Sequence, residues 1–531
     1  MATVTSSPLV FGAGWFDPGE PRLYGSRCPR CDAIAFPARA FCWSCQARAT
    51  RVPVESRGRI LARSRVRVSP AGFPDEYWVA LVETADGFRV VARLDEQSAA
   101  PAIGDAVALT RGEIRTADAG PVIGPVFTAD PGPAPEPVSR RAEPARTPAA
   151  PLPRSRPVYV AGVGMTAFGR HGEAPERLAA DAVLEALEDA GVAPGEVGAL
   201  ILGSAFLPAA EGQRALRHLP FGDIPVVNVE NACASGTTAL LEAVMRVRAG
   251  VSAPIVAVGV DAPLAAGGGL IALADDDPVA GAGVTLPALY ALMGDHYLHG
   301  AGAGPEAFAE VVVRSRAAAA SNERAYMRRP ATREEVLGSR PIADPITLYE
   351  CSANADGAAA AVVVGDDWRS PRDRLVEVLA LELGAGLTKD RFAPPAPAAR
   401  VAERAYAAAG VAPEEVDVVE LHDAFAPAAL ISLESLGLAA AGTAAQRLLD
   451  GGFAGGDTGP ALNPGGGLLS RGHPPGATGL AQVHELVGQL RGEAGARQVA
   501  AARTGLVHTQ GGTVLDLETN ACVVGLLRAV G

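Results

Sequence analysis

The stretch Ala190-Gly191-Val192-Ala193-Pro194 returns as Ala409-Gly410-Val411-Ala412-Pro413, and this repeat decides the fold. The second copy begins 219 residues after the first, and each copy follows an amphipathic helix and leads into an apolar strand. A repeat with so long a period indicates a duplicated domain and not a solenoid. Because strands alternate with helices in both halves, we predict two similar α/β units with mostly parallel sheets, at residues 158–366 and 367–531.

The composition indicates a globular protein with several cores. The chain has 531 residues, 48% of them hydrophobic, which is enough for roughly three domains of about 150 residues. Its formal net charge of −13 argues against nucleic-acid or anionic-membrane binding, which needs clustered Lys and Arg. The first 14 residues do not resemble a signal peptide, and no apolar run of about 18 residues occurs. We expect a cytoplasmic protein with no membrane segment and with small-molecule or protein partners.

Four of the seven cysteines lie near the start of the chain, in two C-x-x-C pairs formed by Cys28, Cys31, Cys42 and Cys45. Each pair can place two thiolates on one tetrahedral Zn²⁺, and the ten-residue gap between the pairs fits a zinc ribbon. Redox use of a C-x-x-C pair is the alternative. We predict a structural zinc site in an N-terminal segment at residues 1–54.

Residues 55–129 show the pattern of a small β-barrel. Apolar and polar residues alternate from Gly58 to Val68, and Asp86-Gly87 separates two further apolar runs, as a hairpin turn does. The predicted barrel is followed by nine prolines between Asp130 and Pro157, a composition that favours extended conformations over a packed core. We therefore predict a linker at residues 130–157.

Cys233 is a candidate nucleophile. It lies where an apolar strand at residues 224–229 changes to a helix that ends near Gly250. Unpaired N–H groups and the helix dipole stabilise negative charge at a helix N-terminus, so we expect the pKa of this thiol to be lowered. A buried structural cysteine is the alternative.

Three histidines lie beside glycine-rich turns in the second half. His422 follows an apolar strand, where its imidazole can donate to an oxyanion or relay a proton. His473 precedes a helix, much as Cys233 does, and follows a loop in which Gly466 lets backbone and substrate approach closely. His508 precedes Gly511 and Gly512, whose backbone N–H groups can form an oxyanion hole. The repeat's symmetry allows a Cys233–His473 pair, while His508 can equally be structural.

Several motifs together resemble the thiolase superfamily, in particular its branch similar to the thiolase domain of sterol carrier protein. They are Asn231–Gly236, His422-Asp423-Ala424-Phe425, Asn463–Gly467 and Gly472-His473-Pro474. The N-terminal ribbon and barrel resemble the DUF35 family, which combines a rubredoxin-like zinc finger with an OB-fold and accompanies thiolase-like enzymes. The resemblance implies a duplicated thiolase fold preceded by a zinc ribbon and an OB-fold barrel, and it implies an acyl-CoA substrate.

The resemblance also implies roles for individual residues. Cys233 would be the acylated nucleophile, His473 would activate it and His422 would help to stabilise the thioester oxyanion. The backbone at Gly511 and Gly512 would form a second oxyanion hole. His508 stands about where other thiolases carry a C-terminal catalytic cysteine, so it is a further catalytic candidate.

The chain departs from the thiolase pattern at Ala424, which occupies the position of a second, acid/base cysteine in the related His-Asp-Cys-Phe motif. Cys522 lies too far into the last strand to replace that thiol, and we interpret Cys351 as a core residue. Acylation of Cys233 still needs only a thiolate, a proton acceptor and an oxyanion hole.

We therefore expect a thiolase-like acyltransferase that performs Claisen or retro-Claisen chemistry on CoA thioesters. Two alternatives are a retro-aldolase acting on a β-hydroxyacyl-CoA, similar to the side-chain aldolases of steroid degradation, and a noncatalytic scaffold. The resemblance further implies at least a homodimer. The N-terminal module would either guide substrate or hold a partner such as a hydratase.

Overall fold

The computed structural model describes residues 9–95, 100–138, 152, 155–271, 277–368, 374–387, 396–512 and 519–530. Most of the predicted linker at 130–157 therefore lies outside the described residues.

The repeat forms the same structure twice. Helix α1 (Pro175–Ala190) leads through a short 3-10 turn, η1 (Pro194–Glu196), into strand β12 (Ala199–Gly203). In the second half, α8 (Pro397–Ala409), η4 (Pro413–Glu415) and β19 (Val418–Glu420) follow in the same order. Gly191 and Gly410 end the two helices in the left-handed conformation, at φ 66° and 64°, which glycine adopts without a Cβ clash. The predicted duplication is confirmed.

Each half contributes five strands to one continuous sheet. The first half has the order β13-β12-β14-β17-β11, and the second has β20-β19-β21-β22-β18, so corresponding strands hold corresponding places. The halves meet where β11 pairs with β18. The remaining strands are β11 (Val158–Met165), β13 (Val226–Val229), β14 (Ile255–Asp261), β17 (Gly357–Gly365), β18 (Val376–Ala385), β20 (Ala461–Leu462), β21 (Thr504–Gln510) and β22 (Ala521–Ala529).

The sheets are mixed, which corrects the expectation that they are mostly parallel. In each half the pairs around β12 or β19 are parallel, whereas β17 and β22 pair antiparallel with both of their neighbours. The β21–β22 connection is short, and a short connection favours antiparallel pairing because a parallel crossover needs a longer segment.

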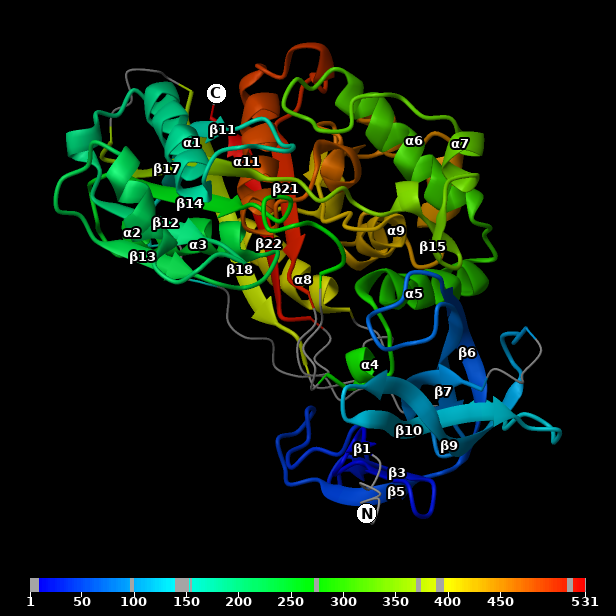
Figure 1. Cartoon of the computed structure of the whole chain (residues 1–531). Coiled ribbons are helices and arrows are strands. Elements are labelled where there is room, and N and C mark those ends of the chain that lie inside the picture. The colour runs from blue at the N-terminus through cyan, green and yellow to red at the C-terminus, as the bar shows by residue number, and fades with distance from the viewer. Residues whose placement is uncertain are drawn as a thin grey trace.

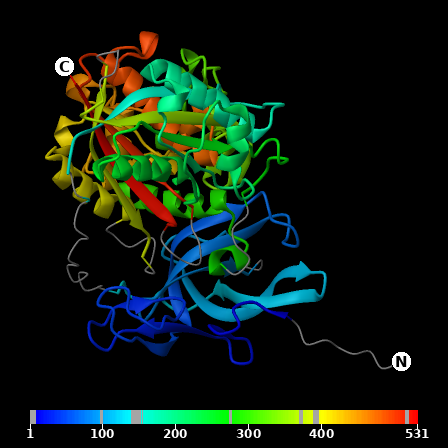
Figure 2. The ribbon, with the colours of Figure 1, turned by 90° about the vertical axis from the view of Figure 1, so that its left-hand side faces the viewer.

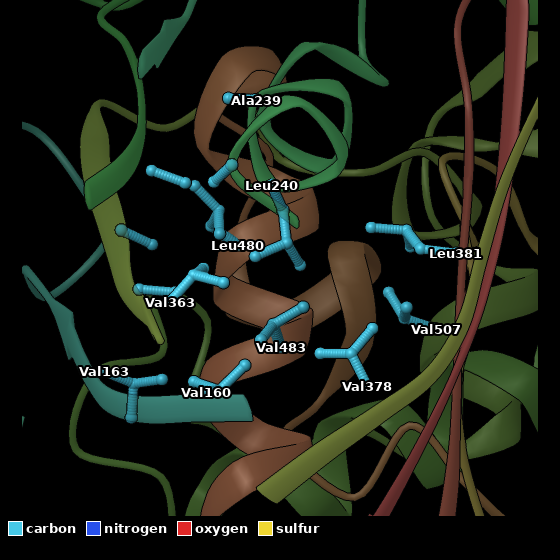
Figure 3. Close-up of a cluster of buried hydrophobic side chains, with 14 of the residues drawn as sticks. Val160, Val163, Ala239, Leu240, Val363, Val378, Leu381, Leu480, Val483 and Val507 are labelled. Atoms are coloured by element: carbon cyan, nitrogen blue, oxygen red, sulfur yellow. The ribbon is translucent and has the colours of Figure 1, made fainter. Parts of the chain in front are cut away.

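Two buried helices lie between the sheets of the two halves: α3 (Ser235–Arg248) and α11 (Pro475–Arg491). Leu240 of α3 and Leu480 and Val483 of α11 pack with Val363 and Val507 in one core (Figure 3). Each such side chain contributes about 1.5–3 kcal/mol by its burial. Helix α1 covers the outer face of the first sheet, while α8 and α9 (Ala426–Ser435) cover that of the second (Figure 1). The molecule is thus layered from helix to sheet to helix to sheet to helix.

Five strands of the N-terminal module close into a small barrel. They are β6 (Arg57–Val66), β7 (Tyr77–Thr84), β8 (Arg89–Leu94), β9 (Ala106–Ala117) and β10 (Gly120–Ala129). The ring runs β6-β7-β8-β10-β9 and returns to β6, with β8 and β10 parallel. This confirms the predicted barrel. The zinc ribbon beside it uses β2 (Phe16–Asp17), β3 (Arg22–Arg27), β4 (Ile34–Ala35) and β5 (Thr50–Val54), while β1 (Leu9–Val10) adds to β10.

The barrel packs against an insertion of the first half, made of α4 (Pro278–Gly281) and α5 (Leu286–Ala301). Leu81 of β7 and Leu289 of α5 share one apolar cluster, and the Tyr77 hydroxyl donates to the Gly283 carbonyl at 2.6 Å. A hairpin of β15 (Pro341–Ala343) and β16 (Ile346–Thr347) extends the barrel sheet where Ala343 pairs with Val66. Figure 2 shows the module lying along one side of the duplicated unit.

The remaining short elements fill the layers around these sheets. They are α2 (Glu211–Ala215), η2 (Leu216–His218), α6 (Glu306–Ala320), α7 (Arg333–Leu337), η3 (Leu348–Glu350), α10 (Ala444–Leu449), η5 (Gly456–Thr458), a π-helical turn η6 (Gly467–Arg471) and η7 (Gly495–Arg497). Within the described part of the chain, no helix combines the length and the apolar character needed to cross a lipid bilayer.

Candidate active site

Cys233 lies in a tight turn between β13 and α3, two residues before the first residue of that helix. Ala232 takes a left-handed conformation at φ 47°, which is rare for a residue with a side chain. The Ser235 hydroxyl stabilises this turn, because it accepts from the Asn231 amide at 2.9 Å and donates to the Ala232 carbonyl at 2.6 Å. The turn presents a half-buried thiol at the surface of the central core.

His473 occupies the corresponding position in the second half, two residues before α11. Its Nδ1 lies 2.6 Å from the Thr478 hydroxyl, which donates to the Pro474 carbonyl at 3.0 Å. Because the hydroxyl has a single proton, this arrangement favours a proton on Nδ1 that is donated to Thr478. The other ring nitrogen, Nε2, is then free to accept a proton from a neighbouring group.

His422 completes the cluster from the end of β19. Its ring centroid lies 5.3 Å from that of His473, and the two rings are nearly perpendicular. One imidazole nitrogen of each histidine and the Cys233 sulfur all lie within 4.8 Å of one another. The duplication therefore brings together the three residues that the sequence singled out from separate motifs.

His508 lies next to the His422 backbone and does not belong to this group of three. Its Nδ1 accepts from the backbone N–H of His422 at 3.5 Å, and its Nε2 finds no partner among the described residues. In this position His508 contacts the segment that carries His422 and does not reach the Cys233 sulfur with the other two.

The two C-terminal glycines differ in what their amides do. The amides of Gly512 and of Cys233 itself act to lower the pKa of the Cys233 thiol. The Gly511 N–H is instead bonded to the Ala521 carbonyl at 2.7 Å. A Cβ on Gly511 would lie 2.7 Å from the Asn231 carbonyl oxygen, so glycine is needed there for close approach to the Cys233 turn.

Gly466 has a backbone role in the turn before η6. It adopts φ +99°, and a Cβ there would meet Ala319 of α6 at 2.7 Å. Its carbonyl accepts from the Ser315 hydroxyl at 2.6 Å. Asn463 attaches the same loop to β19, since its side-chain oxygen accepts from the Leu421 amide at 2.8 Å.

A buried ion pair links the two histidine-bearing segments, and sequence reasoning missed it. Arg471 Nη1 lies 2.9 Å from Glu420 Oε2, and both side chains are almost fully buried. Glu420 precedes His422 by two residues and Arg471 precedes His473 by two. In each segment a charged residue stands two positions before the histidine. This shared spacing was the sequence feature that could have indicated the ion pair.

Asp261, at the end of β14, is a second residue that the sequence did not single out for the site. Its buried carboxylate accepts from the Gly476 amide of α11 at 2.6 Å and from the amides of Ala205 and Phe206 at 3.0 and 3.1 Å. It therefore joins the first half to the N-terminus of the helix that follows His473. Burial raises the pKa of this carboxyl to about 6, against the effect of the three amides.

The expectation of a lowered thiol pKa at Cys233 is wrong for the resting site. Burial and, next, the charge of Asp261 raise the pKa of the Cys233 thiol to about 12, and the amides of Cys233 and Gly512 only partly oppose them. Burial likewise lowers the pKa of His473 to about 3 and that of His422 well below its usual value. The resting cluster is therefore a neutral thiol beside neutral imidazoles.

The other two cysteines do not enter this cluster. Cys522 is buried among apolar residues of the outer layer of the second half, as its position in the strand predicted. The Cys351 backbone bridges to Phe425, but its sulfur lies 3.5 Å from the Thr347 carbonyl and packs in the barrel–α5 cluster. Ala424 is buried, and its carbonyl accepts from the Ser352 amide.

The N-terminal cysteines form a second cluster that fits a zinc ion. The four sulfurs lie within 4.8 Å of one another, with Cys28 to Cys45 at 3.5 Å and Cys31 to Cys42 at 3.6 Å. These separations suit a tetrahedral centre with Zn–S bonds of about 2.3 Å. The Ser44 and Cys45 amides donate to the Cys42 sulfur at 3.3 and 3.4 Å, as is common around a sulfur that binds a metal. This site holds a structural zinc.

Comparisons with known proteins agree with this geometry. Residues 158–263 match the family model "Thiolase, N-terminal domain", residues 388–522 match "Thiolase C-terminal domain-like", and residues 17–51 match "ChsH2, rubredoxin-like zinc ribbon domain". The chain is 36% identical to acetyl-CoA acetyltransferase of Methanothermobacter thermautotrophicus, over 67% of this chain and 97% of that protein.

Two further relatives cover most of the duplicated unit. Benzoylsuccinyl-CoA thiolase subunit BbsB of Thauera aromatica is 34% identical over 67% of this chain and 95% of its own length. Among solved structures, the Ltp2-ChsH2(DUF35) aldolase superposes with a TM-score of 0.61 and 26% identity, covering 70% of this chain and 98% of that one.

The chain belongs to the thiolase family. It is an enzyme that makes or breaks carbon–carbon bonds in acyl-CoA thioesters, and it carries a DUF35-type zinc ribbon and β-barrel at its N-terminus.

Proposed function

We propose that the enzyme is an acyltransferase of retro-Claisen or Claisen type that works through an acyl group on Cys233. The observation that carries this proposal is the convergence of the Cys233 sulfur with nitrogens of His422 and His473 within 4.8 Å. A half-buried thiol with a raised pKa needs a nearby base to ionise, and a neutral His473 whose Nδ1 is held by Thr478 meets this need.

In the cleavage direction the Cys233 proton passes to His473 Nε2 and the sulfur attacks the β-keto carbon. The amides of Cys233 and Gly512 stabilise the oxyanion that forms there, in keeping with their effect of favouring negative charge on the neighbouring sulfur. The carbon–carbon bond then breaks to leave an acyl-Cys233 and the enolate of the shortened acyl-CoA. His422 donates to the enolate oxygen, and the His473 imidazolium returns its proton to the enolate carbon.

This proton transfer from Cys233 through His473 to the enolate carbon lets the carbon–carbon bond break without a second thiol. In the proposed first half-reaction, the proton taken from Cys233 is the one that the enolate carbon receives, so no additional acid is required at Ala424. Free CoA then attacks the acyl-Cys233 and releases the second thioester. His508 supports the backbone of His422 in this scheme, since its Nδ1 accepts from that amide.

A retro-aldolase is the second candidate, favoured by Ala424 and by the similarity to the Ltp2-ChsH2(DUF35) aldolase. Here a histidine takes the β-hydroxyl proton, the carbon–carbon bond breaks, and the resulting acyl-CoA enolate is reprotonated. A ketone or aldehyde leaves with the shortened acyl-CoA. No acyl-enzyme forms and no free CoA is consumed, so the two candidates differ in a measurable way.

Intact mass spectrometry with acyl-CoA candidates separates them. The acyltransferase predicts a mass increase that is lost in Cys233→Ala and kept in Cys351→Ala, together with cleavage that requires free CoA. CoA-independent release of a carbonyl product without any adduct would establish the aldolase instead. Ala424→Cys is a useful third variant, because a thiol at this position should raise thiolase-type exchange if the site performs Claisen chemistry.

We also propose that the insertion between Asp261 and Gly304 shapes the acyl pocket and that the N-terminal module supports it. The Leu264 amide donates to the Asp356 carboxylate at 2.7 Å, and the Asn354 side chain donates to the Gly269 carbonyl at 2.7 Å. The Ala353 carbonyl, beside Asn354, accepts from the His473 amide at 2.9 Å. Changes in the insertion should therefore alter KM for long acyl chains more than for acetyl groups.

Assembly is a further part of the proposal. Strand β13 is one of the two edge strands of the ten-stranded sheet and its residues are half-buried or exposed, so a second copy can pair with it. We expect a homodimer, with a hydratase as a candidate partner of the N-terminal module. Light scattering of the purified chain tests the dimer, and copurification with an acyl-CoA hydratase from the same source tests the partner.

A further inference from the structure

The Cys233 cluster has the composition of a metal site as well as that of a nucleophilic centre. A thiolate and two imidazoles are the ligands that Zn²⁺ prefers, and three protein ligands with an open fourth position are a common zinc arrangement. The three candidate ligand atoms lie within 4.8 Å of one another. In a tetrahedral zinc site they would be about 3.3 to 3.7 Å apart, so binding needs a contraction of no more than about 1.5 Å.

The surroundings of the cluster support such a ligand set. Metal-binding histidines commonly use their second ring nitrogen in a hydrogen bond that fixes the ring, and His473 Nδ1 has that bond to the Thr478 hydroxyl at 2.6 Å. His422 is 3% exposed and its Nδ1 has no hydrogen-bond partner among the described residues. The charge of the Asp261 carboxylate acts on the Cys233 thiol, and negative charge favours a bound cation.

Cys233 is half-buried, whereas His422 and His473 are buried, so Cys233 is the most exposed of the three candidate ligand residues. Ala424 contributes no second thiol that would close the fourth position.

We propose that Cys233, His422 and His473 bind one thiophilic divalent cation of the Zn²⁺ type, and that the bound ion reversibly blocks the nucleophile. The Cys233 S–H bond breaks, its proton goes to solvent, and a sulfur–metal bond forms with no change in oxidation state. The ion then occupies the space that an acyl carbonyl needs. This site is distinct from the ribbon site, whose four cysteines lie in the N-terminal module and leave no open position.

The test is a titration of the full-length chain with Co²⁺ after the ribbon has been saturated with Zn²⁺. Metal analysis first confirms one zinc per chain, and it is repeated at the end to exclude exchange. We expect one further equivalent of Co²⁺ to bind with a sulfur-to-metal charge-transfer absorption and the intense visible bands of a four-coordinate ion. One proton should be released for each ion bound.

Three variants make the assignment specific. Cys233→Ser should abolish the charge-transfer absorption, whereas Cys351→Ser should retain it, because that sulfur packs beside the barrel. Thr478→Val keeps all three ligands but removes the hydrogen bond to His473, so it should weaken Co²⁺ binding about 10- to 100-fold. Retention of the ribbon zinc and an unchanged circular dichroism spectrum verify that each variant is folded.

Either of two results would overturn the proposal: no second equivalent in the wild-type chain, or the same charge-transfer absorption in Cys233→Ser. Because binding is read directly and without turnover, this experiment does not depend on which carbon–carbon reaction the enzyme catalyses. If binding is found, Zn²⁺ should protect Cys233 from acylation. A chelator added to the same sample should restore the acylation.

Discussion

The two halves of the duplicated unit have the same sheet order, but they carry different side chains at the equivalent position before the central helix. Cys233 and His473 each lie two residues before a central helix, yet one is a half-buried thiol and the other a buried imidazole. Each half also supports the other's residue. Asp261 of the first half binds the N-terminus of α11, and the Gly512 amide of the second half acts to lower the pKa of the Cys233 thiol. The duplicated fold thus places a thiol and an imidazole at equivalent positions, and the site is completed by residues such as His422 that have their own place in the second half.

The largest expected effect is the loss of turnover when the first half loses its nucleophile, Cys233. Cys233→Ala should lower turnover by about 10⁴-fold or more, since loss of a nucleophile removes the whole acyl-transfer route. Steady-state kinetics with an acyl-CoA substrate measure this change, and Cys351→Ala serves as the matched control. Near-wild-type turnover in Cys233→Ala would mean that the reaction does not pass through this residue, and the roles of the two halves would have to be reconsidered.

Breaking the buried Glu420–Arg471 ion pair of the second half should lower the stability of the protein as well as its activity. Arg471→Met leaves Glu420 buried without its partner, and breaking a buried ion pair in this way costs about 3–5 kcal/mol of unfolding free energy. Denaturant unfolding measures the loss. The double variant Glu420→Gln, Arg471→Met should recover part of that stability. If turnover returns with it, the pair acts only on folding; if turnover stays low, the pair also sets the spacing of His422 and His473.

Acid should affect the second half selectively, because three of its histidines are buried and neutral. Burial lowers the pKa of His473 to about 3 and that of His508 to about 4. Between these values and the ordinary histidine pKa of about 6.5, the unfolded chain binds more protons than the folded chain. Stability is therefore lost as pH falls below about 6.5, by roughly 1.4 kcal/mol per pH unit for each such histidine.

His508→Gln tests this dependence while leaving the side chains of Cys233, His422 and His473 unchanged. The slope of unfolding free energy against pH, measured by denaturant titration between about pH 6.5 and 4.5, should decrease by about one proton. His218→Gln changes an exposed histidine of the first half and is the control. Equal slopes in the two variants would show that burial of His508 is not linked to folding in this range.

The smallest expected effect concerns the contact between the barrel and the insertion. Tyr77→Phe removes the hydroxyl that donates to the Gly283 carbonyl at 2.6 Å, and it should cost about 0.5–1.5 kcal/mol. Thermal unfolding followed by calorimetry measures it. If the module supports the substrate pocket, KM for long acyl-CoA substrates should also rise while kcat changes little. A change in stability alone would limit the module's role to packing.

Much of the site followed from local sequence patterns. The repeat predicted the duplicated α/β unit, and the Cys233, His422 and His473 motifs predicted residues that the fold does bring together. The spacing of Cys28, Cys31, Cys42 and Cys45 predicted a closed four-sulfur cluster, because C-x-x-C turns determine sulfur positions within a few residues.

Other properties of the site depend on segments far apart in the chain. Asp261 and Gly476 are separated by 215 residues, and their hydrogen bond could not be found from either local sequence. The raised pKa of Cys233 was missed for the same reason, because burial outweighs the effect of the helix N-terminus that the sequence made visible. The mixed sheet direction and the different bonding of the Gly511 and Gly512 amides likewise depended on how β21 and β22 pair.

By itself the sequence determined which residue types are present, where the chain repeats, and which turns carry a cysteine or a histidine. These features are local, because helix, strand and turn preferences act over a few residues. Only the tertiary structure decided that the thiol and the imidazoles are neutral at rest, that Glu420 and Arg471 connect the two histidine segments, and that the barrel shares a core with α5. Burial, long-range charge and packing are properties of the folded chain, since they arise only when distant segments exclude water from one another.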